Sequence, residues 1–231
     1  MSDTTKESLH KEFELERMIL FSDAVFAIAI TLLILEIKFP ELPESYTAKS
    51  IFVFLQPTLI HFAAFIISFF FIGMSWARHL TLCKFLRSYN NTVIFYNLFL
   101  LFFIVTFPFS ISAFIDNIHR DFLVAIIMYI FNIFFVTFAQ YLFANYILKR
   151  NNLILVTGLE EEKQYFFLKA KYSFIMMLTA IVIMVAVALI TNGNLLATGV
   201  SLYVLPVLAL IMKRKLKKHK PASVVLSSGN L

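Results

Sequence analysis

The chain has 231 residues, of which 60% are hydrophobic and only 15% are charged, and its mean hydropathy is +0.84. Soluble domains are about 45–50% apolar and about 25% charged, so this composition excludes an ordinary soluble protein and predicts an integral membrane protein. The net charge of +6 then fits the positive loops of a membrane protein better than a nucleic-acid partner. A single cysteine, Cys83, and five histidines without HxxxH or HExxH spacing indicate neither a disulfide framework nor a metal site.

Six apolar segments are long enough to cross a bilayer, which takes roughly 20 mainly apolar residues. In chain order the predicted spans are 18–37, 51–76, 92–109, 122–148, 172–190 and 195–212. We expect a short polar loop over 110–121 and a charged connector over 149–171. The fold class is therefore all-α, with a lead-in over 1–16, a six-span domain over 17–212 and a basic tail without fixed structure over 213–231.

The basic residues predict the orientation of these spans. All but three of the 20 Lys and Arg residues fall in the N-terminal segment, in the connectors after the second and fourth spans, or in the tail. Because cytoplasmic loops collect Lys and Arg, both termini are expected to be cytoplasmic. The same rule places Cys83 in a cytoplasmic connector after the second span.

Polar residues mark the cytoplasmic third of the first span, where Arg17, Ser22 and Asp23 lie. An ionisable residue inside a span is costly and by default faces other protein or water. In one interpretation Asp23 bonds to a neighbouring helix while Arg17 reaches the lipid headgroups. In the other, these residues form a polar network that fixes the first span and stabilises one pore state. The partners available at the same depth are Trp76, Arg78, His79, Asn91 and Asn97.

A second pattern follows along the same span. Ile28, Leu32 and Leu35 recur at spacings of four and three, with Thr31 beside them, so these positions share one face of a helix. Such an apolar stripe most commonly packs against another helix.

The first span resembles a known family. Arg17-x-x-x-Phe21-Ser22-Asp23 is similar to the RxxxFSD signature of the endolysosomal potassium channel family and its bacterial homologues. The following AVFAIAITLLILEIKFP, then Trp76 and His79, and the NLFLLFFIVTFPF stretch with Asn97 and Pro108 also resemble that family. The resemblance covers the first three spans well and the last three only by hydrophobicity and loop length.

The resemblance implies an assembly and a membrane. Bacterial members have one six-span repeat and form homotetramers, so this chain is expected to be a multi-pass homotetramer of a prokaryotic cell membrane. In the family the first span lines the pore, and the TVGYG filter of ordinary potassium channels is missing, as it is here. Neither an enzyme activity nor a cofactor, a bound metal or a nucleic-acid partner is expected.

The implied function is a potassium-permeable cation channel that favours potassium over sodium. Stacked rings of Ile28, Leu32 and Leu35 would form a pore that gates by dewetting, and the Thr31 hydroxyls would replace part of an ion's hydration shell. Ala27 and Ile34 would face other spans or lipid. The alternative is a secondary transporter or a proton/cation carrier, although such folds usually show inverted repeats and none is detectable in this sequence.

Overall fold

The computed structural model describes residues 3–37, 48–117, 122–149, 159–191 and 204–221. Its regular elements are helices. They are α1 Asp3–Leu32, η1 Leu33–Glu36, α2 Ala48–Cys83, α3 Asn91–Val105, α4 Phe107–Asn117, α5 Phe122–Lys149, α6 Glu160–Ile190 and α8 Val204–Lys217.

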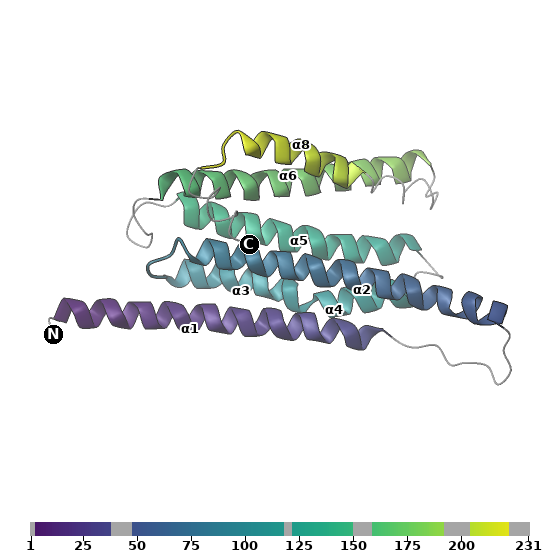
Figure 1. Ribbon diagram of the computed structural model, residues 1–231, viewed down its shortest axis with the longest axis horizontal. Helices are drawn as coiled ribbons and strands as arrows, with labels where there is room; N and C mark the ends of the chain where they lie inside the picture. The colour runs from purple at the N-terminus through teal and green to yellow at the C-terminus, as the bar shows by residue number, and fades with distance from the viewer. Residues whose placement is uncertain (1–2, 38–47, 118–121, 150–158, 192–203, 222–231) are drawn as a thin grey trace.

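The long helices lie side by side, with α1 at one edge of the bundle and α8 at the other (Figure 1). The long helices alternate in direction, with α4 continuing the direction of α3, so the start of α1, the α2–α3 connection, the end of α5 and the start of α6 lie towards one end of the bundle (Figure 1). Within the described residues, five stretches are long and apolar enough to cross a membrane. They are His10–Glu36, His61–Cys83, Asn91–Asp116, Ile127–Lys149 and Glu160–Val187.

The predicted sixth span falls partly outside the described residues, which omit 192–203. Its later part is α8, and this helix continues to Lys217, into the tail that was expected to lack fixed structure. The predicted charged connector over 149–171 is also partly helical, because α6 already begins at Glu160. Three glutamates occupy the first turn of α6, where negative charge stabilises the positive end of the helix dipole.

The prediction of a polar loop over 110–121 is wrong for residues 110–117, which belong to α4. Helix α3 ends at Val105 and α4 begins at Phe107, two residues later. Pro108 therefore interrupts the helical segment without ending it. Proline has no backbone N–H and therefore removes one hydrogen bond of the helical ladder. The helix restarts because the N–H of Ser110 donates to the carbonyl of Thr106 at 3.0 Å.

The side-chain amide of Asn132 on α5 satisfies the backbone groups that this break exposes. In the orientation that suits both ends of the amide, its oxygen accepts from the N–H of Phe107 at 3.2 Å. Its nitrogen then donates to the carbonyl of Phe103 at 3.0 Å. Because the Asn132 side chain is buried, these bonds replace contacts with water and let the broken helix remain inside the bundle.

The interior is rich in aromatic side chains. Phe26 of α1, Phe107 of α4 and Phe143 of α5 are fully buried in one continuous apolar cluster. Rings also meet between helices, for example Phe103 with Phe135 at 4.9 Å between centroids. In a bilayer, helices associate through close packing rather than through exclusion of water, so such ring contacts contribute much of what holds the bundle together.

Candidate functional site

Helix α1 has one face buried against the rest of the chain. Ser22, Phe26, Ala29 and Leu33 are almost completely buried and follow one another at spacings of four, three and four. This spacing is that of one helix face, which packs on α2 and α3. The Leu33 side chain, in the short 3₁₀ segment η1, continues the same buried line.

The opposite face of α1 is exposed and mainly apolar. The side chains of Ile28, Leu32 and Leu35 are 57%, 41% and 71% exposed. Because positions i and i+3 of a 3₁₀ helix eclipse, η1 keeps Leu35 in line with Leu32. Thr31 is also exposed, and its hydroxyl donates to the carbonyl of Ile28 at 2.9 Å. The four residues of the predicted stripe thus share a surface that the described part of the chain leaves uncovered.

Ala27 and Ile34, which were predicted to face other spans or lipid, are exposed as well. They therefore do not pack into the interior of their own chain. Relative to the centre of the stripe they lie to one side of α1, roughly 100° around the helix.

Three of the predicted polar residues form one buried group, made of Ser22 on α1, His79 on α2 and Asn97 on α3. Each side chain is at most 1% exposed. Nδ2 of Asn97 donates to Oγ of Ser22 at 2.9 Å, and Oδ1 of Asn97 lies 2.8 Å from Nε2 of His79. Oγ of Ser22 in turn donates to the carbonyl of Met18 at 2.9 Å. The group joins the first three long helices through bonds whose donors and acceptors are matched.

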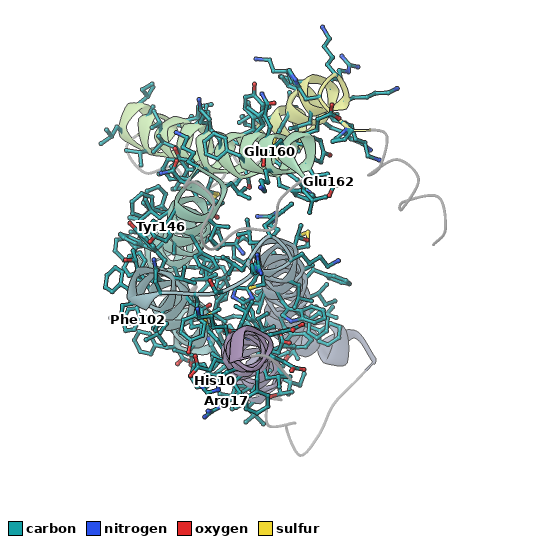
Figure 2. All side chains as sticks on the ribbon, turned by 90° about the vertical axis from the view of Figure 1, so that its left-hand side faces the viewer. His10, Arg17, Phe102, Tyr146, Glu160 and Glu162 are labelled. Atoms are coloured by element: carbon teal, nitrogen blue, oxygen red, sulfur yellow. The ribbon has the colours of Figure 1, made fainter. Side chains whose placement is uncertain are left out.

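Asp23 forms a separate contact, because its Oδ1 accepts from Nε1 of Trp76 at 2.8 Å near the surface of the bundle. Arg17 and Phe21 are exposed, and Figure 2 shows Arg17 on the outer side of α1. No hydrogen bond or ion pair joins Arg17 to Asp23 within the described residues. Six residues separate the two, which places them about 120° apart around the helix. These residues are therefore divided between different faces of α1, and Asp23 bonds to the neighbouring helix α2, as in the first of the two interpretations.

The sequence placed Cys83 in the connector after the second span, but in the structure it lies within α2. It is the last residue of α2, is 4% exposed, and its Sγ lies 3.8 Å from the His79 ring. The sequence interpretation also missed Gln140 on α5, which is buried and donates to the carbonyl of Ser75 at 2.8 Å. The signal that could have identified Gln140 is its position as a polar residue in the middle of an apolar span.

Comparison with known proteins adds a family and a fold. Residues 17–108 match the family described as "Endosomal/lysosomal potassium channel TMEM175". A potassium channel of Chryseobacterium sp. (strain P1-3) is 38% identical over 92 residues, which are 40% of this chain and 44% of that protein. A potassium channel of Streptomyces collinus (strain DSM 40733 / Tue 365) is 32% identical over 101 residues, 44% of this chain and 48% of that protein. The chain thus spans about half the length of the curated relatives it matches.

A solved structure extends the likeness of fold beyond that region. The crystal structure of a lysosomal potassium-selective channel TMEM175 homolog from Chamaesiphon minutus matches with a TM-score of 0.64 and 23% sequence identity. The match covers 86% of this chain and 98% of the other. Residues 17–108, which include both polar contacts of α1, are therefore similar to the endosomal/lysosomal potassium channel family TMEM175 and to its bacterial relatives, and the chain shares the fold of the solved bacterial homolog.

Proposed function

We propose that the chain is one subunit of a potassium-permeable cation channel and that the exposed face of α1 lines its ion path in a homotetramer. The family match and the names of the relatives support the channel activity. The observation that carries the assignment of the path is the uncovered apolar face of α1, which lies opposite its buried face. Four such faces around an axis would enclose a narrow apolar conduit. In this proposal the channel conducts potassium in preference to sodium.

The conduit would work through its rings of side chains. A narrow ring of Ile28 or Leu32 resists wetting, so ions cross only when the ring widens or becomes hydrated. The Thr31 hydroxyl donates its proton to the carbonyl of Ile28, which leaves the oxygen lone pairs free to accept. Four such oxygens can replace part of the hydration shell of a cation, without the backbone-carbonyl filter of other potassium channels.

The buried group of Ser22, His79 and Asn97 has a structural or gating role in this proposal. Its bonds fix the rotation of α1 against α2 and α3. A shift by one residue turns a helix by about 100°, which would move Ile28 away from the axis. The group therefore determines which side chains reach the ion path, and it does not itself bind the permeant ion.

We further propose that both termini are cytoplasmic, in a prokaryotic cell membrane. The start of α1, the α2–α3 connection with Lys84 and Arg87, and the end of α5 with Lys149 lie at one end of the bundle. This arrangement agrees with the sidedness that the positive-inside rule requires.

The test compares two substitutions in recordings from the purified protein in planar bilayers under bi-ionic conditions. Ile28→Asn places four amides at the ring in a tetramer, so we expect higher conductance and weaker discrimination between potassium and sodium. Ile34→Asn is the matched control, because the same residue type is 47% exposed in η1, which directly continues α1, but lies off the stripe. It is expected to lower the folding yield without raising conductance, because it places a polar amide against lipid or against another span.

Two results would contradict the proposal. Equal effects of the two substitutions on conductance would mean that the stripe does not face the ion path. Transport by the unmodified protein that requires a counter-substrate in vesicles would indicate a carrier instead of a channel.

A further inference from the structure

A cavity of about 310 Å³ lies between α2, α5 and α6, on a different side of α2 from the contacts with α1. Cavities that bind small ligands start at about 300 Å³, so this one is large enough for a compact polar group. The side chains that bear on its chemistry are Arg78, Thr81, Gln140, Tyr141, Lys169 and Ser173. Two of them are cationic and three carry hydroxyls, and among the residues that the structure describes no Asp or Glu lines the cavity.

The Arg78 guanidinium has only neutral and distant partners in this cavity. Its Nη1 donates to Oε1 of Gln140 and to Oγ of Ser173, each at 3.4 Å. The nitrogen of the Gln140 amide is held by the carbonyl of Ser75 at 2.8 Å, which keeps its oxygen turned towards Arg78. A cation inside an apolar span is normally paired with an anion, and these two bonds do not supply one.

Lys169 adds a second positive charge to the same cavity. It lies within electrostatic reach of Arg78, so like charges from α2 and α6 face the same cavity. Bringing like charges together where one of them, Arg78, is half-buried is unfavourable. A bound anion removes that repulsion, and it also gives the guanidinium a charged acceptor in addition to the two neutral ones.

The geometry points to a binding site for a phosphate group in this cavity. The planar fork of Arg78 matches two phosphate oxygens and Lys169 adds a point charge. The hydroxyl of Ser173, which accepts from Arg78, keeps its own proton to donate. The phosphate can belong to an anionic lipid headgroup, because basic pockets between membrane helices take such groups, or to a soluble phosphate. The site shares no residue with the proposed ion path and does not depend on channel activity.

The experiment measures binding to the purified full-length protein. Native mass spectrometry counts retained cardiolipin after titration into detergent-solubilised protein. A second arm adds inorganic phosphate to protein in phosphatidylcholine nanodiscs and follows the thermal unfolding midpoint. The variants are Arg78→Gln and Lys169→Gln, with Lys171→Gln as a control that removes another exposed charge of α6, outside the cavity. Lys169 is on the surface of α6, so its variant tests the site even if Arg78→Gln folds poorly.

We expect the apparent affinity to fall about fivefold in Lys169→Gln, with a loss at least as large in Arg78→Gln, and to stay unchanged in Lys171→Gln. That pattern with cardiolipin assigns the phosphate to a lipid, and the same pattern with inorganic phosphate assigns it to a soluble compound. The proposal is overturned if the apparent affinity falls as much in Lys171→Gln as in Lys169→Gln, because the effect then depends on the total charge of the protein and not on the cavity. It is equally overturned if neither phosphate source responds to Lys169→Gln.

Discussion

Replacing Asn97 by Leu removes the centre of the buried polar group while keeping a side chain of similar size. His79, whose side chain is completely buried, then loses the acceptor that lies 2.8 Å from its Nε2. Ser22 is affected less, because its hydroxyl still donates to the carbonyl of Met18. Leaving one buried donor unsatisfied costs about 1–3 kcal/mol of unfolding free energy.

For a chain of this size, that loss lowers the thermal unfolding midpoint by roughly 2–12 °C, at about 2–4 °C per kcal/mol. The assay can use intrinsic fluorescence, since Trp76 is the single tryptophan of the chain. Trp76 bonds to Asp23, so its emission responds when α1 separates from α2. The matched control is Asn91→Leu, the same substitution at an exposed position of the same helix.

The double variant His79→Leu/Asn97→Leu separates a bonding effect from a packing effect. Removing both partners leaves no unsatisfied donor. The double variant should therefore lose less unfolding free energy than the two single variants lose in sum. The reasoning is refuted if Asn97→Leu lowers the midpoint no more than Asn91→Leu does. It is also refuted if the two single losses simply add.

Three further predictions concern the ion path and the topology. Thr31→Val keeps the side-chain shape but removes the hydroxyl, so the potassium-to-sodium permeability ratio should change more than expression does; an unchanged ratio would place Thr31 outside the path. Asp23→Asn retains an acceptor for the Trp76 N–H but loses the charge, so we expect about a fivefold lower tetramer yield or open probability with unaltered selectivity. Altered selectivity alone would mean that Asp23 lines the path. Cys83 is buried and would label slowly, so the topology test introduces the exposed Lys84→Cys in a Cys83→Ser background. A membrane-impermeant thiol reagent should then label inverted vesicles but not intact cells, and labelling of intact cells would reverse the orientation.

The sequence was sufficient to place the polar residues at one depth but not to divide them among partners. Ser22, His79 and Asn97 lie in apolar segments, where each needs a bonding partner, so their meeting follows from their types and depths. Which of them meet depends on how α1, α2 and α3 are rotated about their axes. That rotation results from the packing of many apolar side chains, and an apolar segment by itself does not determine it. For the same reason Trp76 was one of several candidate partners in the sequence, and nothing there singled it out for Asp23.

The break between α3 and α4 shows a second limit. Pro108 in an apolar run reads as the end of a span, because proline cannot continue the helical ladder. Whether a helix stops there or resumes depends on a partner for the exposed backbone groups. Here that partner is Asn132, which is distant in sequence and belongs to α5. Local sequence therefore located the interruption correctly but not its outcome.

Helix α1 continues without interruption from Asp3 to Leu32, and it contains neither glycine nor proline. Thirty residues at 1.5 Å each give a rod of about 45 Å, whereas the hydrocarbon core of a bilayer is about 30 Å thick. The first turns, in which His10 and Glu14 pair at 3.2 Å, therefore extend beyond the hydrocarbon as the same rigid rod that carries Ile28. A torque applied to those turns outside the membrane would meet no hinge before Ile28, so the N-terminal turns and the proposed ion path behave as one mechanical unit.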